Sequence, residues 1–215
     1  MFSTIFNPNN LFFRFTDRVL DIAVLSILWL VCSLPIVTIG AASTALYYSC
    51  AKCLRYKEPK PYRNFVYAFK QNFFTSTLTW LIYLVLLTII IIVYVMLELI
   101  LPDILRVTYL VFMLIPIGVI SFTFPLLSRF DYKASSLLKS SLQLSVKYLA
   151  RTLALAVLVV ASTAIILFFW YCAVMLVVPG LCGLLSTYLL EPIFRIYTKV
   201  QLEDIDDDNL PWYQK

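Results

Sequence analysis

The apolar positions of this chain form long uninterrupted windows instead of a repeating pattern. Four windows hold no Lys, Arg, Asp or Glu: Ile22–Ala51, Gln71–Leu97, Val107–Ser128 and Thr152–Leu190. A bilayer core is about 30 Å thick, so a helix that rises about 1.5 Å per residue crosses it in roughly 20 residues. The last window is therefore long enough for two crossings, with a turn expected at Pro179-Gly180. The pattern predicts an all-α protein, a polytopic transmembrane helical bundle.

The pattern does not decide how many times the first window crosses the membrane. As a single helix it would be about 45 Å long, too long for an untilted crossing. With its flanks it can form two short helices that turn at Pro35–Gly40, because Pro35 lacks a backbone donor and Gly40 permits a tight turn. We favour this interpretation, which gives six spans, over a single kinked first helix, which gives five. The six expected spans are 14–35, 39–56, 71–97, 107–128, 150–178 and 180–198.

Basic residues predict the orientation of these spans, because Lys and Arg in short loops mark the cytoplasmic side. Six basic residues lie in Lys52–Lys70 and five in Arg129–Arg151, two loops that are separated by two spans. With six spans and both termini in the cytoplasm, 16 of the 17 basic residues share one side, and Arg106 is the exception. Five spans would place the N-terminus outside. Residues 1–200 then form one membrane domain, and residues 201–215 form an acidic, mobile cytoplasmic tail.

The composition argues against an enzyme. Hydrophobic residues make up 62% of the chain and charged residues 13%, against roughly 45–50% and 25% in soluble domains, which leaves no room for a separate catalytic domain. The chain has no histidine, the commonest general base near neutral pH and a common metal ligand. Cys50-x-x-Cys53 lacks the second pair that a zinc site needs. We expect no enzymatic activity, no cofactor, no metal site and no nucleic-acid partner.

A helix outside the spans is expected between residues 131 and 149. Apolar residues fall near one stripe of this segment: Ala134, Leu137, Leu138, Leu142 and Leu149. Asp131 is a candidate N-cap, and Lys133, Lys139 and Lys147 lie off the stripe. Such a cytoplasmic amphipathic helix can lie on the inner leaflet with its lysines near lipid headgroups, dock a soluble partner, or simply extend the next span.

Two further sets of residues are candidates for structural roles. Pro35, Thr38, Gly40 and Ala41 form the expected turn, where small residues let two helix backbones approach closely. Glu191 lies in the last span, and Arg195 follows one helical turn later, so the two predict an ion pair near the inner interface.

Three motifs resemble those of a known family of membrane proteins. Trp29–Ala42 (WLVCSLPIVTIGAA), followed by Ala45–Tyr48 (ALYY), resembles the N-terminal signature of the YesL family. Phe69–Phe73 (FKQNF), with Trp80 after it, is similar to the second signature, and Phe124–Asp131 (FPLLSRFD) is similar to the third. The resemblance covers most of the chain, with the motifs in the same order.

The resemblance implies a bacterial multi-pass membrane protein of undefined molecular function. Members of the YesL family are often encoded near carbohydrate-uptake transporters and sugar-responsive two-component systems. The resemblance therefore implies an accessory component of carbohydrate uptake or sensing in the cell membrane. Its partners would be the lipid bilayer and either sugar ABC-transporter subunits or a sensor kinase. A small solute transporter or channel is the alternative, and the oligomeric state is left open.

Overall fold

The computed structural model describes residues 11–55, 60–98, 116–129, 134–168, 174 and 176–201, and within these ranges the chain is helical without strands. The expected all-α class is confirmed. The labelled elements are α1 (Leu11–Ser33), the 3₁₀ turn η1 (Ile36–Thr38), α2 (Ile39–Ser49), the π-helix η2 (Cys50–Arg55), α3 (Pro61–Glu98), α5 (Ala134–Lys147), α6 (Leu149–Phe168) and α8 (Val178–Gln201). A shorter apolar helix, Pro116–Leu127, lies between α3 and α5 in the sequence.

The first apolar window contains two helices with a break at Pro35. Helix α1 ends at Ser33, and Pro35 has an extended backbone (φ −75°, ψ 118°) that cannot continue a helix. The hydroxyl group of Thr38 donates to the carbonyl oxygens of Cys32 (2.6 Å) and Pro35 (2.8 Å), which closes the turn before α2 begins. Two short helices are what the six-span interpretation expects in this window.

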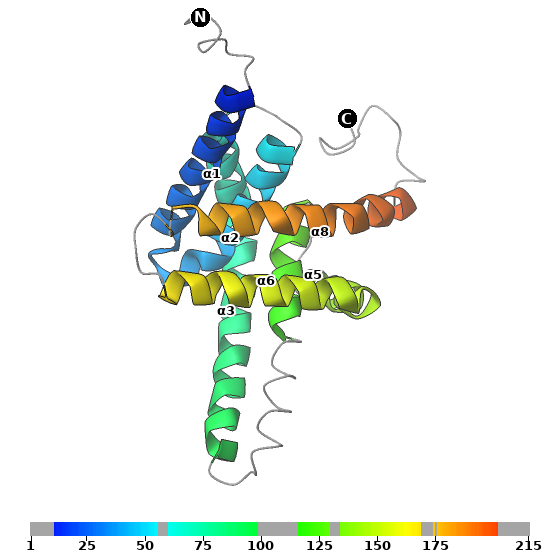
Figure 1. Cartoon of the computed structure of the whole chain (residues 1–215). Helices are drawn as coiled ribbons and strands as arrows, with labels where there is room; N and C mark the ends of the chain where they lie inside the picture. The colour runs from blue at the N-terminus through cyan, green and yellow to red at the C-terminus, as the bar shows by residue number, and fades with distance from the viewer. Residues whose placement is uncertain are drawn as a thin grey trace, which may run out of the picture.

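Helix α3 is the longest element, with 38 residues and a length of about 57 Å. Its first half packs against α2, and its second half extends beyond the other described helices (Figure 1). Along the second half, most side chains are apolar and exposed. One helix thus has a packed end and an uncovered end.

Helices α6 and α8 pack side by side and run in opposite directions (Figure 1). Helix α8 begins at Val178, so Pro179 and Gly180 lie in its first turn and not in the connection before it. Proline is tolerated there because the first N–H groups of a helix have no intrahelical partner. Both helices run across α3 in Figure 1, so the described helices do not form one set of parallel spans.

Two of the described helices are long and apolar enough to cross a membrane, α3 over Pro61–Met96 and α6 over Leu149–Phe168. Helices α1 and α8 carry charged residues that shorten their apolar runs: Asp17, Arg18 and Asp21 in α1, and Glu191 in α8. Six crossings therefore stay a prediction. Because α6 runs across α3, both can cross one bilayer only if at least one of them is strongly tilted.

Within the described residues, two apolar clusters are buried. One includes Tyr47, Phe122, Leu126, Leu190 and Phe194 and joins α2, the helix Pro116–Leu127 and α8. The other joins α1, α2, η2 and α3, and its members are Ile22, Leu25, Ala45, Leu46, Tyr48, Cys50, Leu54, Phe65 and Ala68. The first cluster surrounds the polar site described below.

The segment that is expected to be amphipathic contains the helix α5, which begins at Ala134 and ends at Lys147. Within the expected stripe, Leu137 is buried, whereas Leu142 and Leu149 are exposed. Leu144, Ser141 and Ser145 are buried with Leu137 on the face that is turned to the protein. The exposed face also mixes the two kinds of residue, because Leu142 and Val146 lie there with Lys139, Gln143 and Lys147.

Candidate functional site: a buried ion pair beside Pro192

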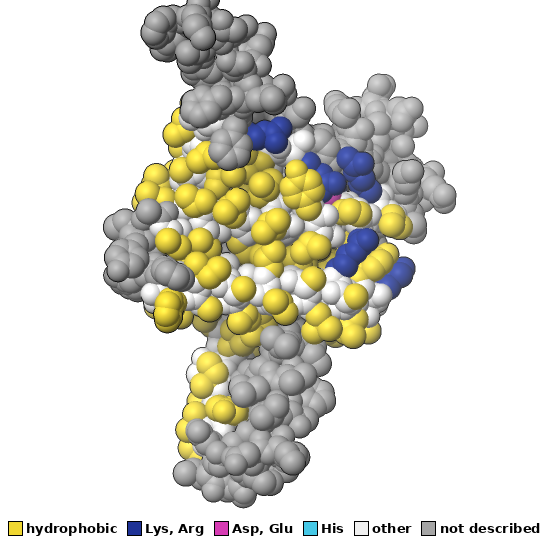
Figure 2. All heavy atoms as spheres, viewed as in Figure 1, with side chains coloured by type: hydrophobic (Ala, Val, Ile, Leu, Met, Phe, Trp, Pro, Cys, Tyr) yellow, Lys and Arg dark blue, Asp and Glu magenta, His cyan; other side chains and the backbone are white. Residues whose placement is uncertain are grey.

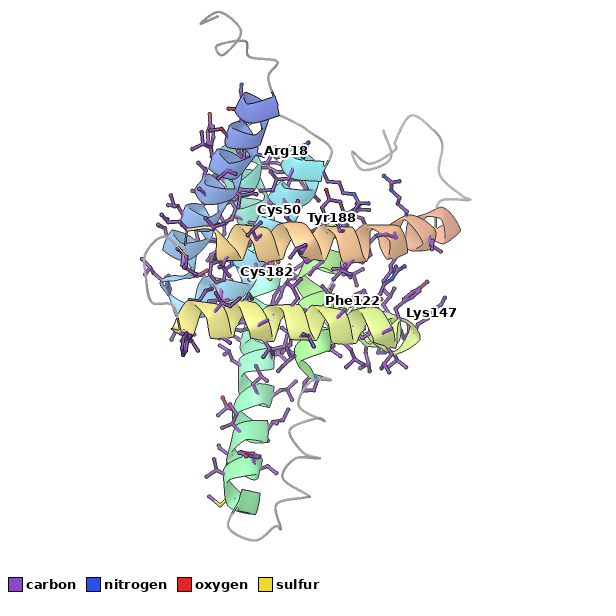
Figure 3. All side chains as sticks on the ribbon, viewed as in Figure 1. Arg18, Cys50, Phe122, Lys147, Cys182 and Tyr188 are labelled. Carbon is purple, nitrogen blue, oxygen red and sulfur yellow. The ribbon has the colours of Figure 1, made fainter. Side chains whose placement is uncertain are left out.

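Pro192 lies inside α8 and weakens the local backbone hydrogen bonding. A proline has no N–H, so the carbonyl four residues earlier, that of Tyr188, loses its helical donor. At the neighbouring carbonyl, that of Thr187, the guanidinium of Arg55 donates from Nη1 at 2.6 Å. The same guanidinium lies over the ring of Tyr188, 5.4 Å from its centroid; Figure 3 labels Tyr188 on α8. The π-helix η2 thus places a cation against α8 about one helical turn before the proline.

Glu191, the residue before this proline, is fully buried and forms an ion pair with Arg129. Arg129 Nη2 donates to Glu191 Oε2, and both side chains have no exposed surface. The other carboxylate oxygen, Oε1, accepts a hydrogen bond from the hydroxyl of Tyr47 at 3.2 Å. Each oxygen of the carboxylate therefore has a donor, as a buried charge requires.

Arg129 reaches this position because the helix Pro116–Leu127 ends in a hydrogen-bonded turn. The hydroxyl of Ser128 donates to the Pro125 carbonyl at 2.7 Å, and the backbone N–H of Arg129 donates to the Leu126 carbonyl at 3.2 Å. The turn directs the arginine toward α8 instead of away from the protein.

Aromatic rings enclose the ion pair. The guanidinium of Arg129 lies over the ring of Phe194, 5.5 Å from its centroid. The rings of Phe122 and Tyr47 meet Phe194 edge to face, with centroids 6.2 and 6.3 Å away. This contact with an aromatic face adds to the attraction between the charges. The site therefore ties α2, the turn at Arg129 and α8 together.

The arrangement can play a structural role. A buried ion pair contributes little net stability, but removing one partner leaves the other charge buried and unpaired. The charges of Arg129 and Glu191 offset each other, and Arg55 adds one positive charge nearby. Among the described residues, no group of three or more His, Cys, Asp or Glu side chains could hold a metal ion. The site can fix the relative positions of three helical segments.

The structure brings Glu191 to a partner that the sequence did not suggest. Arg129 is 62 positions away in the sequence and was counted only as a loop cation. The predicted pair of Glu191 with Arg195 stays a prediction. A signal for Arg129 was present, because it directly follows an apolar window and lies inside the third motif.

The expected turn residues meet α3 and the helix Pro116–Leu127. A Cβ atom added at Gly40 would lie 2.6 Å from the Trp80 Cβ and 2.9 Å from the Phe124 Cε1, so only glycine fits here. The indole N–H of Trp80 donates to the Ile36 carbonyl at 2.7 Å. Ala41, the next residue, is fully buried. Residues of all three sequence motifs therefore pack together at this point.

The remaining candidate residues lie on or beyond α5. Lys139 and Lys147 are exposed on this helix, and Lys147 Nζ lies 5.7 Å from the centroid of the Tyr148 ring. Asp131 and Lys133 lie outside the described residues. Of the predicted tail 201–215, Gln201 is the last residue of α8, and residues 202–215 lie outside the described residues.

The chain is similar to proteins of unknown function. Residues 22–94 match the family model described as "Protein of unknown function, DUF624". The chain is also similar to the "Uncharacterized protein YteU" of Bacillus subtilis (strain 168), with 31% identity over 198 residues, which cover 87% of this chain and 86% of that protein. No solved structure matches the chain significantly. Because the similarity to YteU extends over most of both proteins, the chain belongs to the DUF624 family.

Proposed function

We propose that this protein is a multi-pass integral membrane protein of the bacterial cell membrane. The observation that carries this proposal is the outward-facing apolar surface of the second half of α3. At the spacing of an α-helix, its exposed apolar side chains cover more than half of the circumference, and Leu87, Ile90 and Tyr94 on the remaining side are half-buried. The exposed residues are Val85, Leu86, Ile89, Ile91, Ile92, Val93, Val95 and Met96. A helix that is apolar all round is stable only where lipid or protein covers it.

Helix α6 supports the same proposal. Val157, Leu167 and Phe168 are exposed on it, and Phe168 retains 84% of its surface. Apolar side chains cover much of the face shown in Figure 2, while many of the visible Lys and Arg atoms lie toward its right side. Such a separation of charge from apolar surface is expected of a protein with basic loops on one side of a bilayer.

For the orientation, we propose six spans with both termini in the cytoplasm. The break at Pro35 supports this arrangement, because it divides the first window into two helices. A reporter enzyme fused to the N-terminus, active only inside the cell, tests the proposal. Activity of the fusion is expected, whereas an N-terminus found outside would favour five spans.

We propose further that the protein is a YesL-type, non-enzymatic accessory component of carbohydrate uptake or sensing. The carbohydrate context is supported by the three motifs and their resemblance to that family. A structural role is supported by the site itself, because the ion pair of Arg129 and Glu191 is enclosed by aromatic rings and joins three helical segments.

Purification from native membranes in mild detergent tests the accessory role. We expect mass spectrometry of the purified material to identify sugar ABC-transporter subunits or a sensor kinase. An unrelated multi-pass protein with the same tag is the matched control. Preparations that contain neither kind of partner beyond the level of this control would contradict the proposal.

A small solute transporter is the second candidate, and Pro192 is the observation that favours it. Transporters often bind solutes where a membrane helix is interrupted, and charges inside a membrane often mark a transport path. In α8 an interrupting proline directly follows the buried Glu191. Solute uptake by vesicles that contain only the purified protein, lost in a Glu191→Gln variant, would favour transport over the accessory role.

A further inference from the structure

Exposed apolar residues lie on both sides of the junction of α5 and α6, where Tyr148 forms a turn between the two helices. The backbone N–H of Tyr148 donates to the Leu144 carbonyl at 2.9 Å, and the Tyr148 carbonyl accepts from the N–H groups of Arg151 and Thr152, each at 3.0 Å, so hydrogen bonds join the two helices directly. The exposed apolar residues follow at intervals of three and four positions: Leu142, Val146, Leu149, Leu153, Val157 and Val160. We name these six residues the outward stripe.

The charges near the outward stripe have a single sign. Residues 134–168 contain Lys139, Lys147 and Arg151 but no Asp or Glu. Lys147 and Arg151 are one helical turn apart, and both lie over the Tyr148 ring, 5.7 and 6.0 Å from its centroid. In Figure 3, Lys147 lies at the end of the molecule where α5 meets α6.

The guanidinium of Arg151 also has an unfilled donor. Its Nη1 atom is buried and has no hydrogen-bond partner among the described residues. This buried part of the guanidinium faces the protein, so a headgroup would meet the remaining, exposed part of the Arg151 side chain and Lys147. The junction therefore combines two adjacent cations with an apolar surface beside them.

We propose that the junction of α5 and α6 binds the headgroup of an anionic phospholipid, with the outward stripe against the acyl chains. The inference rests on the proposed location in a membrane and adds the class of lipid that the protein selects. Amphipathic helices with Lys and Arg beside an apolar surface bind anionic bilayers in this way.

The length of the outward stripe favours lipid over a docked soluble protein. A soluble partner bound to α5 would cover Leu142 and Val146, but the stripe continues along α6, a helix long and apolar enough to cross the membrane. One continuous bilayer covers both parts of the stripe. The two cations then lie at the level of the headgroups, because they are near the start of α6.

The test measures lipid binding by the full-length protein in neutral detergent. Phosphatidylglycerol and phosphatidylcholine with identical acyl chains are titrated separately, and bound lipid is counted by native mass spectrometry. We expect the wild-type protein to prefer phosphatidylglycerol. In the Lys147→Gln/Arg151→Gln variant, its affinity should fall about fivefold for each charge removed. The single variant Lys147→Gln changes an exposed position, so it should not affect folding. Its affinity for phosphatidylglycerol should fall by the amount expected for one charge.

The matched control is Arg63→Gln/Lys70→Gln, which removes two exposed cations from α3 and changes the net charge equally. Phosphatidylglycerol binding should be unchanged in this control. An equal loss in both double variants would mean nonspecific attraction and would overturn the proposal. Wild-type binding of phosphatidylcholine as tight as that of phosphatidylglycerol would overturn it too.

Two further outcomes separate this inference from its alternatives. If the Lys147→Gln/Arg151→Gln variant keeps its lipid but loses a copurified soluble protein, α5 is a protein-docking face and the lipid proposal is wrong. If alkaline carbonate releases the wild-type protein from membranes, the proposed membrane location itself fails. A protein that stays in the membrane without headgroup preference contradicts only the present inference.

Discussion

The surroundings of Glu191 and the second half of α3 distribute polarity in opposite ways. Around Glu191, charged side chains are buried inside apolar packing, and Arg129 has no exposed side-chain surface. Along the second half of α3, apolar side chains point outward, and Val85 retains 60% of its surface. Water-soluble proteins bury few charges and rarely expose apolar patches of this size. A buried ion pair thus lies in one region of the molecule, and an uncovered apolar surface lies in another.

Removing one partner of the buried ion pair should cause the largest loss of stability. Glu191→Leu leaves the charge of Arg129 buried without its carboxylate, and such changes cost about 3–5 kcal/mol in unfolding free energy. The double variant Arg129→Met/Glu191→Leu should recover most of that loss, because it removes both charges. Reversible denaturation in detergent micelles provides the measurement.

The exposed Arg63 on α3 is the control for the ion pair, and Arg63→Gln should leave stability within about 0.5 kcal/mol of wild type. A Glu191→Leu variant as stable as this control would contradict a buried, tightly paired charge. The loss of unfolding free energy in the double variant is also compared with the summed losses of the single variants Arg129→Met and Glu191→Leu. A double variant that loses more than this sum would contradict the pairing as well.

A charge placed on the outward surface of α3 should cause the next largest change, a loss of membrane insertion. Position 85 lies near the middle of the predicted span 71–97, where an aspartate costs about 2.5–3.5 kcal/mol of insertion free energy. An assay that reports the inserted fraction of α3 should therefore show a loss for Val85→Asp and none for Val85→Leu. Equal insertion of the two variants would mean that Val85 does not face lipid.

The packed end of α3 should respond to a single added methyl group. In Gly40→Ala the new Cβ would lie 2.6 Å from the Trp80 Cβ and 2.8 Å from the Ser76 carbonyl oxygen, neither of which can move easily. We expect a loss of about 1–3 kcal/mol, typical of overpacking, measured as a lower melting temperature. Val37→Ala, at an exposed neighbouring position, should change it little. A Gly40→Ala variant that melts at or above wild type would contradict the close approach.

The turn at Pro35 should show the smallest effect. Thr38→Val removes the hydroxyl that donates to the Cys32 and Pro35 carbonyls but keeps the shape of the side chain, so it should cost about 1 kcal/mol. Thr38→Ser keeps the hydroxyl and should retain most of the stability. Equal melting temperatures for the two variants would show that these hydrogen bonds do not stabilise the turn.

The sequence predicted the helices of this fold better than their contacts. Uncharged windows and Pro35 locate helices and a break because these features act within one segment. The contact between Arg129 and Glu191 joins residues 62 positions apart, and helical periodicity does not state which helix meets which. The burial of Ser141 and Ser145 on α5 could not be predicted for the same reason, because spacing does not identify the partner that a helix face meets.

Site-directed spin labelling of the second half of α3 tests the membrane location most directly. Nitroxides at positions 85, 89 and 92 are compared with one at position 63, in protein reconstituted into vesicles. The account predicts that relaxation at the first three positions responds strongly to oxygen, which dissolves in lipid, and weakly to a water-soluble nickel chelate, with the reverse at position 63. Strong nickel accessibility at positions 85, 89 and 92 would contradict the account.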